Sequence, residues 1–288
     1  MNMIRLLFCN RHYLLLVLVA ICSCKSAIKE QSDKIYSRHL QRHVNLTIIS
    51  TRVPDQKSDM NLLLLNAGND LKQMDLNEII DSLFSEKLIQ PLVLVAIEGR
   101  ENEEYGMANL STTGKQGNKA DKYNEFVINE LYPFIKKKTA IRKFNSIAIC
   151  GNSLKGISAL DIAWQNADKI DKVGVFSANF NYKGTVGIKG ETQNAILQEI
   201  SSSRKRPKLS YWFYAAGTQS TFQEAEGKQV ALIDSTTMKQ TKALIDIIDK
   251  KNTGSKADIK FVLGKSGSND INSWRQYFAD FLLWAFSK

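Results

Sequence analysis

Asn145-Ser-Ile-Ala-Ile-Cys-Gly-Asn-Ser-Leu-Lys-Gly-Ile-Ser-Ala-Leu160 is the stretch that decides the fold of this 288-residue chain. Its first part, Ile147 to Cys150, is a short apolar run rich in β-branched residues, which indicates a buried strand. The strand pattern ends at Gly151, and from Ile157 onward the apolar residues recur at helical spacing. The chain is therefore expected to pass from strand to helix through a turn that carries Ser153.

This turn is close to the pattern G-x-S-x-G, in which a sharp strand-to-helix turn exposes a serine hydroxyl at the carboxyl end of a parallel sheet. It reads Gly151-Asn-Ser-Leu-Lys-Gly156, so Ser153 takes the position of the nucleophile. The last glycine of the pattern is replaced by Lys155, and a glycine follows at Gly156. We expect the long cation either to extend toward solvent or to widen the turn.

Candidate strands and helices alternate on both sides of this stretch. The strand candidates are 45–50, 61–65, 91–97, 147–150, 173–177, 211–215 and 259–263. The helix candidates are a pattern ending at Leu83 and the segments 121–137, 193–201, 236–249 and 273–286. Near-continuous apolar strands that alternate with helices are typical of parallel sheets. The chain is thus predicted to be an α/β protein with a mostly parallel sheet, covered by helices on both faces, in one domain at 36–288.

The N-terminal residues predict a secretory signal rather than part of the fold. Two arginines precede the apolar run Tyr13 to Cys22, which is too short to span a bilayer. A small residue before Cys24 resembles a bacterial lipobox, so we expect a signal peptide at 1–23 and a lipid on Cys24. Residues 24–35 are then expected to form a polar tether, with the protein anchored to a membrane of the bacterial cell envelope. A secretory signal without acylation is the alternative.

Composition excludes some classes of function. The hydrophobic content of 43% and charged content of 24% are those of an ordinary globular protein, and the net charge is +10. Basic residues are scattered except at Lys136–Lys138 and Arg204–Arg206, where we expect solvated charges at helix ends. No basic stripe interleaved with aromatic residues is present, so nucleic-acid binding is not expected. Cys150 is predicted to be a buried thiol, and no intrachain disulfide is expected.

Several further segments resemble the putative esterase family of α/β-hydrolases, which includes enterochelin-esterase-like and esterase-D-like proteins. The segments that carry the resemblance, together with the serine turn, are 62–66, 99–106, 117–135, 157–164, 172–177 and 274–284. The resemblance covers roughly residues 45–288. It implies the α/β-hydrolase fold and a catalytic triad that runs serine, acid, histidine along the chain.

The triad positions implied by this resemblance are degenerate. Ser153 matches the nucleophile. The family acid falls in Gly217-Thr218-Gln219-Ser220, so its position holds Ser220. The family histidine lies five residues before Trp274, where this chain has Asn269. The backbone N–H of Leu154 and one from the loop 66–69, which contains Gly68 and Asn69, are expected to form the oxyanion hole.

No alternative base is evident in the sequence. The three histidines are His12, His39 and His43, so none follows the serine. His12 leaves with the signal, and the other two are expected to precede the first strand, far from the serine. A serine hydroxyl is a weak nucleophile without an adjacent base. Lys155 is about 200° around the helix from Ser153, and the histidine pair is expected to be a surface feature rather than a metal site.

These observations favour a non-catalytic esterase-like protein that binds a small molecule or glycan in the former substrate cleft, without a cofactor or metal. An active serine esterase with a non-standard base is the alternative, acting on a carbohydrate, acyl or siderophore ester. A purely structural envelope lipoprotein is a third hypothesis. The oligomeric state is left open.

Overall fold

The computed structural model describes the chain from Ser26 to the C-terminus with several gaps. The described residues are 26–53, 59–67, 74–111, 117–180, 184–186, 191–192, 194–215, 218–223, 229–234, 236–252, 256–264 and 271–288.

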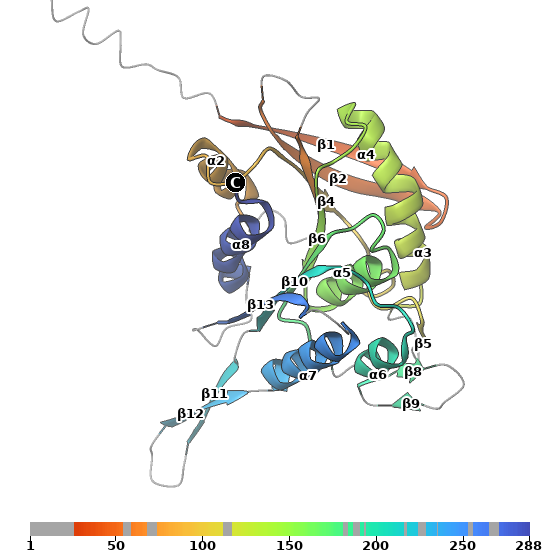
Figure 1. Ribbon diagram of the computed structural model, residues 1–288, viewed down its shortest axis with the longest axis vertical. Helices are drawn as coiled ribbons and strands as arrows, with labels where there is room; N and C mark the ends of the chain where they lie inside the picture. Colours follow the sequence, from red (N-terminus) through yellow and green to blue (C-terminus); the bar gives the residue numbers. More distant parts are fainter. Residues whose placement is uncertain are drawn as a thin grey trace, which may run out of the picture.

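An eight-stranded sheet forms the centre of the molecule (Figure 1). Its strands are, in spatial order, β1 (Ile28–Ser37), β2 (Arg42–Thr51), β4 (Leu92–Ile97), β3 (Asn61–Asn66), β6 (Ile147–Asn152), β7 (Lys172–Phe176), β10 (Ser210–Ala215) and β13 (Asp258–Leu263). Strand β2 is antiparallel to both of its neighbours, and all the other pairs are parallel. The sheet is therefore mostly parallel, as the sequence predicts.

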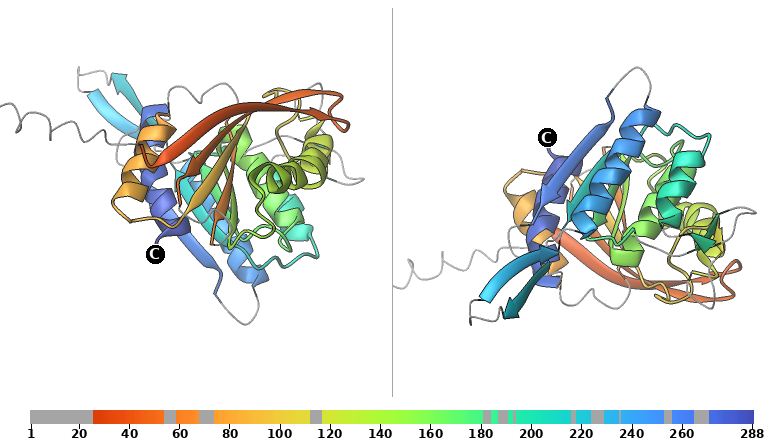
Figure 2. Two further views of the ribbon diagram at one scale, coloured as in Figure 1. Left: turned by 90° about the horizontal axis from the view of Figure 1, so that it is seen from above. Right: turned by 90° about the horizontal axis from the view of Figure 1, so that it is seen from below.

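Helices cover both faces of the sheet, as Figures 1 and 2 show. One face carries α2 (Leu76–Ser85) and α8 (Ile271–Phe286), which pack against each other. The other face carries α3 (Ala120–Glu125), the π-helical segment η2 (Phe126–Leu131), α4 (Tyr132–Thr139), α5 (Ser153–Gln165), α6 (Ala195–Ser202) and α7 (Thr236–Lys251). Each face buries its own hydrophobic cluster, and among the described residues both clusters begin no earlier than Ile28. The described residues thus supply all eight strands of this sheet and both hydrophobic clusters.

Each of the predicted strands and helices is present, with ends displaced by a few residues. The candidate at 147–150 becomes β6 (Ile147–Asn152), because the strand continues through the two residues that lead into the turn. The helix expected at 121–137 spans 120–139 and contains the π-helical segment η2. Such boundary shifts are ordinary, because helix and strand ends fray.

The polar tether expected at 24–35 is wrong for most of its length. Residues 28–37 form β1, a strand at the edge of the sheet that pairs with β2 along its whole length. Its sequence, Ile-Lys-Glu-Gln-Ser-Asp-Lys-Ile-Tyr-Ser, is polar because most of its side chains face solvent. Charged residues on an edge strand also discourage pairing with other chains.

Short strands outside the main sheet were not expected from the sequence. A small sheet joins β5 (Leu110–Ser111), β8 (Gly184–Val186) and β9 (Glu191–Thr192). A two-stranded ribbon, β11 (Thr218–Gln223) with β12 (Gln229–Asp234), projects from the body of the molecule after β10 (Figure 1). The ribbon lies in the segment where the family acid was expected.

Candidate active site

Ser153 lies at a strained turn between β6 and α5. It is the first residue of the helix, its side chain is exposed, and its φ is 47°. This left-handed backbone conformation is unfavourable for a residue other than glycine, at a cost of about 1–3 kcal/mol. Such strain persists only where the surroundings enforce it, and it is the geometry of a nucleophile elbow. The elbow predicted from the sequence is therefore present.

Two glycines allow the elbow to close. A Cβ on Gly151 would lie 2.7 Å from the carbonyl carbon and oxygen of Lys155, and one on Gly156 would lie 2.7 Å from the carbonyl oxygen of Gly151. Gly156 also faces Val175 of the neighbouring strand at 3.1 Å. The close approach of helix to strand is thus made by Gly156, and a side chain at position 155 does not prevent it.

A buried amide fixes the backbone of the elbow helix from the adjacent strand. Asn66, the last residue of β3, is fully buried, and its Nδ2 donates to the carbonyl oxygen of Lys155 at 3.1 Å. Its Oδ1 accepts from the hydroxyl of Tyr123 at 2.8 Å. Burial raises the pKa of Tyr123, so this hydroxyl stays protonated and continues to donate. Asn66 therefore acts as a structural support of the elbow.

Lys155 does not extend freely into solvent, and it does not widen the turn. The residue is 7% exposed, and its Nζ lies 2.6 Å from Oε1 of Glu101. Glu101 belongs to the polar segment after β4, and half of its side chain is exposed. The cation is therefore placed beside the elbow by a carboxylate from a different loop.

The segment that carries Glu101 is itself fastened at several points. Arg42 makes a two-pronged ion pair with Glu104, with nitrogen–oxygen distances of 2.7 and 2.5 Å. Oδ2 of Asp161, a buried residue of α5, accepts from the backbone N–H of Ala108 at 2.9 Å and from Asn124 Nδ2 at 2.7 Å. Burial raises the pKa of this carboxyl, and the hydrogen bonds oppose the rise. The loop beside the elbow is thus held by charged and polar contacts.

A second serine with the same backbone conformation lies on the neighbouring strand. Asn152 pairs with Phe176 in the register of β6 and β7, so Ser153 and Ser177 occupy equivalent positions just beyond. The φ of Ser177 is also 47°. Its hydroxyl and Oδ1 of Asn152 are buried without a hydrogen-bond partner in the described part of the chain. Buried polar atoms of this kind are rare and call for a functional or structural explanation.

The predicted oxyanion hole is only partly described. Leu154 lies in the first turn of α5, where backbone N–H groups have no partner within the helix. The N–H of Ala67 is already engaged, since it donates to the carbonyl oxygen of Ile97 at 3.3 Å. Gly68 and Asn69 lie outside the described residues. Leu154 thus remains the available donor among those the structure describes.

The expected acid and histidine positions are not brought to the serine by any described contact. The backbone of Ser220 lies in β11, paired with Leu232 in the projecting ribbon. Asn269 lies outside the described residues, as does Cys24. The assignment of Ser220 and Asn269 to the triad positions stays a prediction.

His39 and His43 lie within the first hairpin rather than ahead of it, which corrects the expectation from the sequence. His39 is in the turn between β1 and β2, and His43 is the second residue of β2, exposed and packed edge-on against Tyr36 at 5.3 Å. Strands β4 and β3 lie between β2 and β6, so His43 is separated from the elbow strand by about 14 Å. A hydrogen bond to Ser153 is therefore out of reach.

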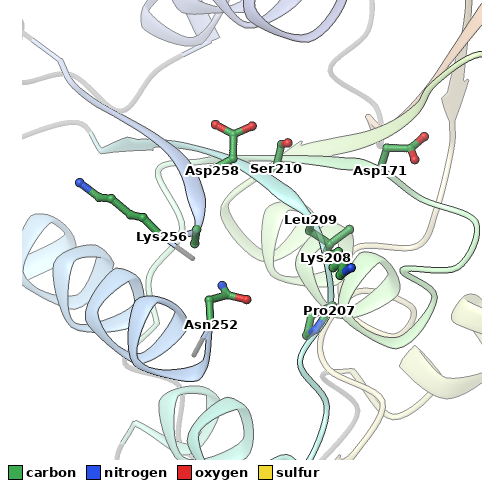
Figure 3. Close-up of a pocket in the computed structure, with 9 residues that line it drawn as sticks. Asp171, Pro207, Lys208, Leu209, Ser210, Asn252, Lys256 and Asp258 are labelled. Carbon is green, nitrogen blue, oxygen red and sulfur yellow. The ribbon is translucent and has the colours of Figure 1, made fainter. Parts of the chain in front are cut away.

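Other features of the described residues add little to the site. They contain no group of three metal-ligating side chains and no helix long and apolar enough to cross a membrane. A hollow of about 370 Å³ lies at the amino ends of β7, β10 and β13, away from the elbow (Figure 3). It is lined by side chains of both signs, among them Asp171, Lys256 and Asp258.

The fold and the elbow together define an α/β-hydrolase of the esterase type. A family model described as Putative esterase matches residues 37–285. The chain belongs to this family. No curated protein sequence matches it.

Solved structures of esterases share the fold. The enterobactin esterase FES from Shigella flexneri, with enterobactin present, has a TM-score of 0.65 at 15% identity over 88% of this chain, which covers 58% of that one. A ferulic acid esterase gives 0.64 at 14% identity, covering 90% of this chain and 98% of that one. The siderophore hydrolase EstB from Aspergillus nidulans gives 0.63 at 14% identity, covering 91% and 96%. This chain therefore spans a little over half of the enterobactin esterase.

Proposed function

We propose that this protein is a non-catalytic member of the esterase family that binds a small molecule or glycan at the elbow edge of the sheet. The proposal rests on one observation, which is that no histidine side chain lies within hydrogen-bonding reach of the elbow serine, Ser153. The chain has no histidine after residue 43, and His43 lies three strand spacings from β6. An unassisted serine hydroxyl is too weakly nucleophilic for turnover.

The replacement of the elbow glycine by Lys155 supports the same conclusion. An ammonium group in an ion pair has no lone pair with which to take a proton from Ser153. Its position beside Glu101 instead offers a charged pair to a polar ligand. The unpaired oxygens of Asn152 and Ser177 would gain hydrogen bonds from a ligand or water at the same edge.

The ligand class is inferred from the relatives. The structural neighbours include a ferulic acid esterase, a siderophore hydrolase and an enterobactin esterase, and one structure of the last contains 2,3-dihydroxy-N-benzoyl-serine, a conjugate of a hydroxylated aromatic acid. We infer that a hydroxylated aromatic acid or its conjugate is the ligand class to test first.

Ester hydrolysis with a non-standard base is the second candidate. The φ of 47° at Ser153 favours it, because a strained serine is maintained although no base has been identified. If the protein is non-catalytic, the close packing of Gly151 against Gly156 explains the same backbone strain at Ser153.

Ligand binding predicts a rise in melting temperature. We expect 2,3-dihydroxy-N-benzoyl-serine or ferulic acid to stabilise the chain, by about 2.7 kcal/mol when the ligand is at 100 times its Kd. The Ser153→Ala variant should show the same rise, because the hydroxyl is not required for binding. Free serine is the control ligand. If neither aromatic compound changes the melting temperature while an activated ester is turned over, the non-catalytic proposal fails.

We also propose that the protein is held on the bacterial cell envelope by a lipid on Cys24. The support is the short apolar run that ends at Ser23-Cys24. Replacing Cys24→Ala should move the protein from a membrane pellet washed at high salt to the soluble fraction, because the acyl chains supply an affinity that salt does not screen. Retention of the cleaved variant in the salt-washed pellet would exclude the acyl anchor.

A further inference from the structure

A cluster of cations lies at the end of α4 and in the turn that leads to β6. Five of the eight residues in Lys136–Lys143 are lysine or arginine, and none is acidic. The helix dipole accounts for lysines in the last turn of α4. It does not account for Arg142 and Lys143, which lie beyond the helix end at Thr139. This cluster, 136–143, is called the α4 cluster below.

Most of this charge is not neutralised within the protein. In the part of the chain that the structure describes, Lys138 forms an ion pair with Asp33 at 2.8 Å, and no other cation of the α4 cluster forms one. Lys136 packs over the ring of Tyr132 instead, at 5.5 Å. Lys137, Arg142 and Lys143 are exposed. The cluster therefore presents unpaired positive charge to solvent.

The cations border a shallow, open depression in the surface. Its volume is about 360 Å³, and it is lined by Lys136, Lys137, Ala140, Ile141 and Arg142. Only cations and aliphatic side chains line it. The hollow shown in Figure 3 differs, because the negative charges of Asp171 and Asp258 there balance the positive charges of its lysines. The α4 cluster is thus suited to anionic groups that carry apolar neighbours, as phospholipid headgroups do.

The α4 cluster lies at the same end of the molecule as the start of the described chain (Figure 1). Asp33, the partner of Lys138, is five residues after Ile28, which places the start of β1 about 17 Å from Asp33 along the strand. Cys24 is only four residues before Ile28, a reach of at most about 14 Å. The described chain therefore begins at the same edge of the sheet as the α4 cluster, but against α2 on the opposite face, where the N–H of Ala27 donates to Asp81.

The elbow that carries Ser153 lies at the opposite end of strand β6 from the α4 cluster. The α4 cluster precedes the amino end of β6, and Ser153 follows its carboxyl end. Six residues of strand separate the two by about 20 Å. A surface bound to the α4 cluster would leave the elbow facing away from it.

We propose that the α4 cluster docks on anionic phospholipid headgroups at a membrane surface, and so orients the domain with Ser153 directed away from the bilayer. The proposal does not depend on acylation of Cys24, although an anchor there would add to it. A membrane is favoured over a nucleic acid because the N-terminal segment joins at this end and because the hollow contains Ala140 and Ile141 rather than stacking aromatic residues.

Vesicle sedimentation tests the proposal with residues 24–288 carrying Cys24→Ser, since all eight described strands of the main sheet and both described hydrophobic clusters lie within that range. Binding is expected to vesicles that mix phosphatidylglycerol with phosphatidylcholine, and to be lost on phosphatidylcholine alone or at high salt. Each basic side chain near such a surface contributes a factor of about five in affinity. The triple variant Lys137→Gln, Arg142→Gln, Lys143→Gln should therefore lose roughly a hundredfold.

A matched control distinguishes binding by the α4 cluster from binding that depends only on the net charge of the protein. Lys122→Gln, Lys239→Gln, Lys242→Gln removes the same charge from exposed positions on α3 and α7, and should change binding by less than a factor of about five. Equal losses in the two triple variants would overturn the proposal. Binding to duplex DNA that depends on the α4 cluster, without binding to vesicles, would overturn it as well.

A footprint on the full chain in nanodiscs does not depend on any variant folding. Acetylation of Lys136, Lys137 and Lys143 should be slowed in discs that contain phosphatidylglycerol, relative to phosphatidylcholine discs, and acetylation of Lys122 and Lys239 should be unchanged. Equal acetylation of the cluster in both kinds of disc would show that it does not face the membrane.

Discussion

The Gly156→Val variant is expected to lose about 3 kcal/mol of folding stability, at the upper end of the usual cost of overpacking. The first carbon of the side chain would lie 2.7 Å from the backbone oxygen of Gly151 and 3.1 Å from Val175, so either α5 must move away from β6 or the elbow must open. Gly156→Ala should lose less, because it adds only that carbon and gains about 1 kcal/mol of helix propensity.

Urea denaturation of the two variants and the parent measures this effect. The graded order parent, alanine, valine is the expected result. A valine variant as stable as the parent would show that the helix does not approach the strand as closely as described, and that Gly156 has no part in closing the elbow.

The double change Asn269→His with Ser220→Glu is expected to raise hydrolysis of an activated ester well above the rate of the parent. The histidine supplies the base that Ser153 lacks, and the glutamate orients it. An imidazole left in the wrong tautomer costs about 10⁴ in the serine-protease example, so Asn269→His alone should give little. The gains should be non-additive, because the two groups act as a unit.

Rates of the parent, both single variants and the double variant decide this prediction, with folding checked by circular dichroism and melting. Because β11 projects from the body of the molecule, the test shows in particular whether a side chain at position 220 can act on a histidine beside Ser153. A folded double variant that reacts no faster than the parent would mean that Ser220 and Asn269 are not the triad positions, or that their loops lie too far from Ser153.

The elbow could be predicted from the sequence because its determinants are local. Gly151, Ser153 and Gly156 lie within six residues of one another, and the change from strand to helical spacing occurs at the same place. The central strands were equally evident, since strands buried on both faces are apolar along their whole length.

Strand β1 was missed because an edge strand need not be apolar. Only Ile28 and Ser37 of its ten residues are buried, so its composition is that of a linker. Its pairing with β2 depends on backbone hydrogen bonds, which leave no sequence pattern when the side chains face solvent. The position of His43 was misjudged for the same reason.

The supports of the elbow could not be predicted because they join distant parts of the chain. Glu101 pairs with Lys155 across 54 positions, and Asn66 reaches the same residue across 89. The sequence shows that each is polar, and that 98–119 is a long polar segment of the kind that often carries function. Their partners are established only by the register of β3 against β6 and by the folding of that segment over α5.

The rate of activated-ester hydrolysis by the parent and by Ser153→Ala tests the central claim most directly. The claim is that no base reaches the elbow serine, so the two proteins are expected to hydrolyse a short-chain activated ester at the same low rate across neutral pH. A working triad loses far more on removal of one member, since only about 10³ to 10⁴ over water then remains from the oxyanion hole and binding. A fall of a hundredfold or more in Ser153→Ala would contradict the account and show that the serine still reacts.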